Sequence, residues 1–227
     1  MEMEITLPDE LPAMTLPDVA FFPQALLPLH IFEPRYREML KDVLAADRLF
    51  AVAGLNSSPA AGAGQFEPPH RIASVGIVRA CQENADGTSN LLLQGICRVE
   101  LTRIVTDSPY RRVGIRALAS EGITDKSGNA RLRAEVMRLL DLKQKFGAPI
   151  SPDMAGFLRT IDDPETFVDL AAFSLCEDPK LRQQLLETLD LPARLGLFVR
   201  RLRTDLDALT LQRRLQGPLA DEQIPLN

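Results

Sequence analysis

The residues that could carry catalytic or metal chemistry are few in this sequence, and they lie far apart. There are two histidines, His30 and His70, and three cysteines, Cys81, Cys97 and Cys176. Zinc sites use histidine and cysteine ligands at short, repeated spacings, and the sequence contains neither a CxxC pair nor an HExxH motif. The sequence therefore predicts no metal site and no cofactor. An odd number of scattered cysteines also favours free thiols in a reducing compartment.

Motifs for nucleophilic catalysis and for phosphate binding are missing as well. His30 or His70 could serve a Ser/His/acid triad, but no serine stands in a GxSxG elbow. No GxxxxGK[ST] loop is present, and Gly62 and Gly64 lack the strand-to-helix context that phosphate binding needs. Carboxylate pairs such as Asp162–Asp163 stand where helices are expected to begin, and there they complement the helix dipole. From these residues we expect no enzyme activity.

The charge balance argues against nucleic acid as a partner. The chain has 227 residues, with 26 Lys and Arg against 31 Asp and Glu, which gives a formal net charge of −5. Binding to a phosphate backbone usually requires a basic excess. Arg200, Arg201, Arg203, Arg213 and Arg214 form a locally basic run. Such a run is typical of a solvated helix face, and a patch for RNA or for an acidic partner is the minority alternative.

Composition predicts a cytoplasmic globular protein of one or two domains. Hydrophobic residues make up 45% of the chain and charged residues 25%, which is typical of proteins with a packed core. Residues 1–6 are acidic and lack the apolar stretch of a signal peptide. No apolar run approaches the roughly 18–20 residues that span a bilayer, so no membrane association is expected. No feature predicts an oligomeric state.

Short segments rich in apolar and β-branched residues predict that the first half of the chain consists of strands. These segments are 13–16, 19–22, 50–53, 75–80, 91–93, 96–105 and 111–118. The Asp86–Gly87 pair predicts a hairpin turn between two of them. One helix interrupts the strands, with Pro34 at its first position and an apolar face that begins at Tyr36.

The second half predicts helices, because signals for a helix start recur there. Ser151–Pro152, Asp163–Pro164 and Asp178–Pro179 each combine a capping side chain with a proline suited to the first helical position. Helices are expected near 129–147, 152–161, 164–175, 179–189 and 191–215. The last has an apolar seam from Leu195 to Leu209, too short for a free coiled coil and typical of a bundle helix.

A shift in composition near residues 120–129 separates these two halves. We therefore predict a β-rich lobe over residues 1–120 and a helical-bundle lobe over residues 121–227. Strands followed by helices, rather than alternating with them, indicate an α+β fold class.

One segment is far more specific than these patterns. It reads LLPLHIFEPRYREML over residues 26–40 and follows LPDVAFFP over residues 16–23. Together they closely resemble the opening of the LON substrate-binding domain, the N-terminal part of ATP-dependent Lon proteases, which also occurs in cereblon-type and RING-finger proteins. The matching order continues with DRLF at 47–50, VGIV at 75–78, DGT at 86–88, LQGICRV at 93–99 and LLETLD at 185–190. The resemblance covers about residues 10–210.

This resemblance implies a PUA-like β pseudo-barrel lobe followed by an α-helical bundle. Lon proteases continue into an ATPase module and a Ser/Lys peptidase module, neither of which is in this sequence, nor is a RING zinc pattern. We therefore expect a stand-alone, non-catalytic domain that recognises unfolded or exposed apolar polypeptide segments. It could act as an adaptor in protein quality control, docked on a separate ATP-dependent protease or ATPase. An RNA- or small-molecule-binding module on a PUA-like scaffold is the alternative.

Within the most specific segment, Phe32, Arg35 and Tyr36 are the candidate binding residues. Pro28 restricts the chain and removes a backbone donor, so this stretch is expected at a sheet edge or a crossover. His30 is expected to be a hydrogen-bonded residue of the core or rim rather than a ligand. A polypeptide is expected to bind on an apolar patch beside an exposed strand edge, or in the groove between the lobes.

Overall fold

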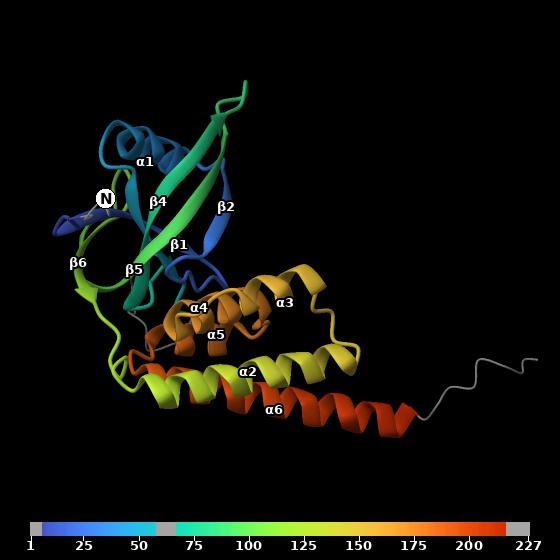
Figure 1. Cartoon of the computed structure of the whole chain (residues 1–227). Coiled ribbons are helices and arrows are strands. Elements are labelled where there is room, and N and C mark those ends of the chain that lie inside the picture. The colour runs from blue at the N-terminus through green and yellow to red at the C-terminus, as the bar shows by residue number, and fades with distance from the viewer. Residues whose placement is uncertain (1–5, 58–66, 217–227) are drawn as a thin grey trace, which may run out of the picture.

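The computed structural model describes residues 6–57 and 67–216, and it shows an α+β fold in which a β lobe sits on a layer of helices (Figure 1). The strands are β1 (Glu10–Leu16), β2 (Leu26–Ile31), β3 (Leu49–Gly54), β4 (Ile72–Glu83), β5 (Ser89–Thr106) and β6 (Arg112–Leu118). The helices are α1 (Pro34–Ala45), α2 (Lys126–Lys145), α3 (Pro152–Arg159), α4 (Pro164–Leu175), α5 (Pro179–Glu187) and α6 (Leu191–Gln216). None of these helices is both long and apolar enough to cross a membrane. The predictions made for residues 1–5, Gly62 and Gly64 lie outside the described residues.

The β lobe is a distorted barrel that closes through one long strand. The strand order is β2-β5-β4-β3-β1-β6, and β6 pairs again with β5, which completes a circuit of five strands. Val99 of β5 pairs with Ala73 of β4 on one side and with Ala117 of β6 on the other. Register shifts in both ladders mark bulges, which bend a strand and increase its twist. The expected pseudo-barrel is confirmed, although its closure depends on a bent β5 rather than on a regular ring.

Strand β2 lies at the edge of this sheet, as Pro28 predicted. Among the strands of the described residues it pairs only with β5, from Leu26 opposite Gln94 to Ile31 opposite Ser89. A proline cannot donate to a second neighbouring strand, so it is tolerated at this position.

Segment 19–22 was predicted as a strand, and this prediction was wrong. The segment is irregular, yet Ala20, Phe21 and Phe22 are at most 2% exposed. Its backbone is satisfied outside a ladder, because Ser74 Oγ donates a hydrogen bond of 2.6 Å to the Phe21 carbonyl. The apolar run therefore reflects burial in the core rather than strand pairing. In addition, the two predicted strands 91–93 and 96–105 are one continuous strand, β5.

The three helix starts predicted from a capping residue followed by proline are confirmed, at Pro152, Pro164 and Pro179. Ser151 Oγ accepts a hydrogen bond from the Met154 amide at 3.1 Å. Asp163 and Asp178 accept equivalent bonds from the backbone at the starts of α4 and α5. Helix α2 begins at Lys126, three residues before its predicted start, because the side chain of Asp125 caps it.

The core has two parts. One is the barrel interior, where Ala51, Val75, Val99 and Val113 are at most 1% exposed. The other extends from the outside of the barrel into the helices and is continuous across both lobes. Strands end at Leu118 and helices resume at Lys126, while the division into two units at residue 120 stays a prediction.

A buried ionic cluster joins the barrel to the helices within this second core. The guanidinium of Arg98 on β5 donates two hydrogen bonds to the carboxylate of Asp169 on α4. Arg194 on α6 donates a third, at 2.9 Å. The three side chains are at most 2% exposed. The cluster therefore fixes the position of the helical lobe against the barrel, and with it the shape of the space between them.

Candidate functional site

The three predicted binding residues stand together in sequence at the start of α1, but the structure does not bring them to one surface. Phe32 is 61% exposed, and its ring stacks on that of His30 with centroids 6.0 Å apart. Tyr36 is only 5% exposed, and its hydroxyl lies 3.4 Å from the carbonyl oxygen of Thr15. Burial raises the pKa of the Tyr36 phenol. Of the two aromatic rings, only that of Phe32 is accessible to a ligand.

Arg35 is engaged by neighbouring side chains. Its guanidinium lies 2.9 Å from carboxylate oxygens of both Glu33 and Glu67, and 4.5 Å from the centre of the Tyr36 ring. The hydrogen bond to Glu67 raises the pKa of Arg35 above its ordinary value. Arg35 therefore ties the start of α1 to the segment before β4.

His30 lies at the rim, as expected. Its Nδ1 is 2.8 Å from the amide oxygen of Asn90 on the neighbouring strand, and the side chain is exposed. This bond supports the pairing of β2 with β5 rather than a ligand site.

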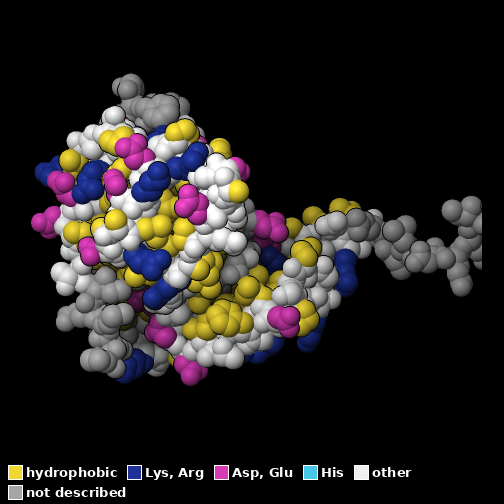
Figure 2. Space-filling view, turned by 90° about the horizontal axis from the view of Figure 1, so that it is seen from above, with side chains coloured by type: hydrophobic (Ala, Val, Ile, Leu, Met, Phe, Trp, Pro, Cys, Tyr) yellow, Lys and Arg dark blue, Asp and Glu magenta, His cyan; other side chains and the backbone are white. Residues whose placement is uncertain are grey.

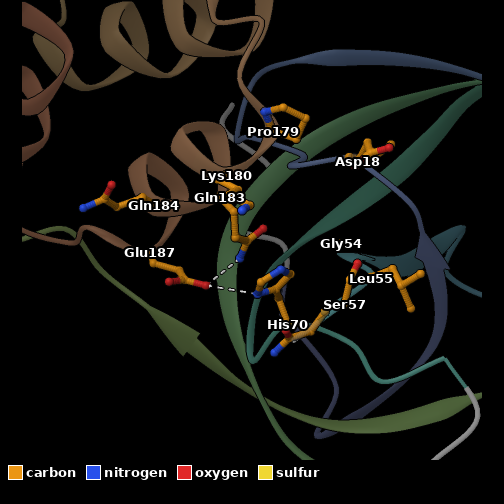
Figure 3. Close-up of a pocket in the computed structure, with 12 residues that line it drawn as sticks. Asp18, Gly54, Leu55, Ser57, His70, Pro179, Lys180, Gln183, Gln184 and Glu187 are labelled. Carbon is orange, nitrogen blue, oxygen red and sulfur yellow. Dashed lines mark hydrogen bonds and ion pairs between the residues drawn. The ribbon is translucent and has the colours of Figure 1, made fainter. Parts of the chain in front are cut away.

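A cavity of about 550 Å³ lies between the barrel and α5, and it is the strongest candidate site (Figure 3). The barrel contributes Gly54 at the end of β3 and His70 just before β4. Helix α5 contributes Lys180, Gln183 and Glu187. Residues three and four apart share a face of a helix, so the spacing of these three side chains directs them to the same wall.

Gly54 allows the barrel wall to come close to the backbone of the segment that contains Val19. A Cβ atom at this position would lie 2.7 Å from the carbonyl oxygen of Val19 and 3.3 Å from Gln183 Oε1. The His70 amide donates a 2.8 Å hydrogen bond to the Gly54 carbonyl, which holds the two sides of this wall together. Only a residue without a side chain fits here unless its neighbours move.

Hydrogen bonds link the polar groups of the cavity (Figure 3). Gln183 Nε2 donates to Glu187 Oε1 at 2.8 Å and to the carbonyl of Ile72 at 3.1 Å. His70 Nδ1 lies 3.5 Å from the same Glu187 oxygen. A histidine beside a carboxylate is two-thirds of a hydrolytic triad, and Ser57 lines the same cavity. Among the described residues, however, no hydrogen bond joins Ser57 to His70.

Described residues also line smaller cavities elsewhere. One of about 320 Å³ lies between the end of α2 and α6, and another, of about 330 Å³, lies beside Arg98 and Asp169. Cys176 lines the first of these, where burial raises the pKa of its thiol and so disfavours the reactive thiolate. In the described part of the chain, no three His, Cys, Asp or Glu side chains are grouped to hold a metal ion.

Sequence reasoning did not single out the α5 wall. Gln183 and Glu187 read as ordinary polar positions of an amphipathic helix, and His70 was considered only as a triad member. The available signals were weak: a Gln–Glu pair four residues apart, and a glycine directly after a buried strand. Neither indicates a cavity unless the barrel and the helices are already placed against each other.

Comparison with known protein families gives one extended match. The sequence model of the family described as ATP-dependent protease La (LON) substrate-binding domain matches residues 10–204. Lon protease of Desulfosudis oleivorans is 24% identical over 219 residues, which are 95% of this chain and 26% of that protein. Lon protease of Trichlorobacter lovleyi is 27% identical over 225 residues, which are 97% of this chain and 27% of that protein. The chain thus spans about a quarter of the length of the curated relatives that it matches.

Solved structures give the same fold. The N-terminal domain of a Mycobacterium avium complex Lon protease superimposes with a TM-score of 0.66 at 16% identity, covering 86% of this chain and 98% of that chain. The Lon N-terminal domain protein of Xanthomonas campestris gives a TM-score of 0.60 at 18% identity, covering 84% of this chain and 97% of that chain. At such identities the likeness concerns the fold alone.

Proposed function

The chain belongs to the ATP-dependent protease La (LON) substrate-binding domain family, and on this premise we propose that it binds polypeptide segments without catalysing a reaction. The family match covers a substrate-binding domain and reaches only about a quarter of the length of the Lon relatives. Their proteolytic activity is therefore not transferred to this chain.

The observation that carries the proposal is the open cavity between the barrel and α5. Its volume of about 550 Å³ falls within the range of roughly 300–1,000 Å³ that is usual for ligand sites. It combines apolar walls, including Val19 and Leu55, with a few polar groups that are already positioned. A side chain of an extended polypeptide would enter it while the neighbouring residues lie along the two lobes.

Exposed apolar groups offer further contact area for such a segment. Hydrophobic side chains gather where the barrel meets the helices (Figure 2). Leu26 on the edge strand β2 is 50% exposed, Phe32 is 61% exposed, and Phe157 on α3 is 51% exposed. Of the three residues predicted for binding, we assign client contact to Phe32, and we assign to Arg35 and Tyr36 the support of α1.

The charges at the cavity favour polypeptide over nucleic acid. Its charged lining consists of Asp18, Lys180 and Glu187, an excess of one negative charge that would repel a phosphate backbone. We therefore rank an RNA-binding role lower. As a finer proposal, the chain acts in the cytoplasm as an adaptor that presents polypeptides to an ATP-dependent protease or ATPase.

A titration tests the proposal. A fluorescently labelled, reduced and alkylated protein that cannot refold is titrated with this chain, and its anisotropy is measured. Disordered clients lose conformational entropy on binding, so we expect saturable binding at micromolar Kd or weaker, about −8 kcal/mol or less favourable. The label should stay on an intact polypeptide throughout, as judged by gel electrophoresis. Absence of saturation up to about 1 mM would reject the proposal, and the same protein in its native folded form is the control.

A further inference from the structure

The side-chain amide of Gln183 has a fixed orientation in the α5 cavity. Its Nε2 donates to two groups that can only accept at this point, the carbonyl of Ile72 and the carboxylate of Glu187. A flipped amide would direct its oxygen at both of these oxygens, so the opposite assignment is excluded by chemistry. Figure 3 shows the amide oxygen pointing away from Glu187.

That amide oxygen is buried and has no partner. Gln183 is only 6% exposed, and its Oε1 makes no hydrogen bond to any described residue. A buried acceptor without a donor costs about 1–3 kcal/mol, and native proteins rarely leave one without a purpose. Because Gln183 lines the α5 cavity, a donor bound there is the group that we expect to satisfy this oxygen.

The surrounding charges identify the kind of donor. The carboxylate of Glu187 adjoins the Gln183 amide and, as an acceptor of up to four hydrogen bonds, has capacity beyond its bond from Nε2. Asp18 adds a second carboxylate on the opposite wall, and Lys180 is the cation among the lining residues. A neutral donor would satisfy the amide oxygen alone, whereas a cationic donor would also be attracted by the negative excess.

We propose that the α5 cavity binds a basic side chain, a lysine or an arginine, of the polypeptide client; this inference rests on the proposed function. The side-chain ammonium or guanidinium donates to Gln183 Oε1 and to the Glu187 carboxylate together. A guanidinium presents several donors in one plane and fits two neighbouring acceptors better than a point charge does. The site thus selects clients that carry a basic side chain, the charged anchor, and apolar contacts outside the cavity contribute further binding free energy.

The experiment compares three short unstructured peptides that are identical except for one central residue: arginine, lysine or glutamine. Binding of each labelled peptide to the full chain is measured by anisotropy at low ionic strength and again at high salt. We expect the two basic peptides to bind about tenfold more tightly than the glutamine peptide, with the difference reduced by salt. In Glu187→Gln this preference should fall to about twofold or less, because charge-assisted hydrogen bonds to the carboxylate are lost.

Glu38→Gln is the matched control. Glu38 is an exposed residue of α1, which lies on the opposite side of the β lobe from α5 (Figure 1), and its substitution changes the net charge by the same amount. It should leave the preference unchanged, and amide NMR shifts on adding the arginine peptide should concentrate at Gly54, His70 and Gln183. Equal binding of all three peptides, unaffected by Glu187→Gln, would overturn the basic anchor while polypeptide binding stands. Failure of every peptide and of the unfolded protein to bind would overturn the proposed function itself.

Discussion

Arg98 on β5 and Asp169 on α4 form a two-pronged ion pair inside the protein, with N–O distances of 2.7 Å and 2.6 Å. They are 71 positions apart in sequence, and both side chains are at most 2% exposed. Arg98 Nε also donates to the carbonyl of Leu186 at 3.1 Å. One guanidinium therefore reaches two helices of the second lobe at once, and it defines how the barrel sits on them.

Replacement of Asp169 by asparagine should destabilise the protein strongly. The substitution removes the buried counter-charge of Arg98 and Arg194 and leaves them the half-buried carboxylate of Glu165, 3.7 Å from each guanidinium. Breaking such a buried pair costs about 3–5 kcal/mol. The free energy of unfolding from urea titration measures this loss. Glu135→Gln is the control, since it breaks ion pairs with Arg138 and Arg203 at the surface and should cost about 1 kcal/mol or less at neutral pH. Equal losses in the two variants would contradict the locking role of Asp169.

Substitutions of Phe32 and Tyr36 should separate client contact from structure. Tyr36 is buried in the main core, so Tyr36→Ala should lower the free energy of unfolding by about 3–5 kcal/mol. Phe32 is mostly exposed, so Phe32→Ala should change it by about 0.5 kcal/mol or less while weakening the binding of unfolded polypeptide. Urea unfolding and anisotropy titration measure the two effects. A large loss of stability in Phe32→Ala would show that the ring is part of the fold.

The stability of the protein should fall in acid partly through Glu135. Hydrogen bonds from Arg138 and Arg203 lower the pKa of Glu135 from 4.5 to about 2. Because the folded-state value is the lower one, this contribution is present above pH 4.5 and is lost as the pH falls from about 4.5 to 2. In Glu135→Gln the decline of the free energy of unfolding over this range should be shallower, and the ionic contribution of Glu135 should vanish only below about pH 2. Its side chain is 24% exposed, so solvent screening keeps the effect at about 1 kcal/mol or less.

The sequence predicted most of the local structure, because local structure has local causes. Capping residues such as Ser151 and Asp163 satisfy the first amides of a helix wherever the rest of the chain lies. Pro28 excludes a central strand by its missing N–H, and β2 is indeed an edge strand. The strand prediction for segment 19–22 was wrong because its conformation depends on the tertiary fold. Its apolar run indicates burial, and burial alone does not separate a strand from an irregular core segment.

The candidate site was not predictable in the same way, because it is made by contacts between distant segments. Gln183 and His70 are 113 positions apart, and only the packing of α5 on the barrel brings both to one cavity. In the sequence, Arg98 was noted only as part of the family motif LQGICRV at residues 93–99, and no role was predicted for it. Its burial follows from Asp169, and no spacing rule connects two residues in different lobes. A sequence motif was therefore sufficient to identify the family, whereas the cavity could be identified only from the three-dimensional structure.

Gly54→Ala tests the close approach that shapes the cavity. The added Cβ would lie 2.7 Å from the Val19 carbonyl, closer than real Cβ atoms come, and that neighbour is backbone that moves only with its chain. Overpacking of this kind typically costs about 1–3 kcal/mol. We therefore expect a loss of that size in the free energy of unfolding by urea, and weaker binding of unfolded polypeptide because the methyl group also narrows the space beside Gln183 Oε1.

The matched control is Gly156→Ala on α3, where an added Cβ meets no atom within 4 Å. In a helix the same substitution should be neutral or stabilise by up to about 1 kcal/mol, because alanine loses less backbone entropy than glycine. Binding of unfolded polypeptide should not change in this variant. If Gly54→Ala instead kept both its stability and its affinity, the barrel wall would have moved to admit the methyl group. The cavity would then be adaptable rather than preformed, and the fixed acceptor at Gln183 would lose its role as the anchor for a client.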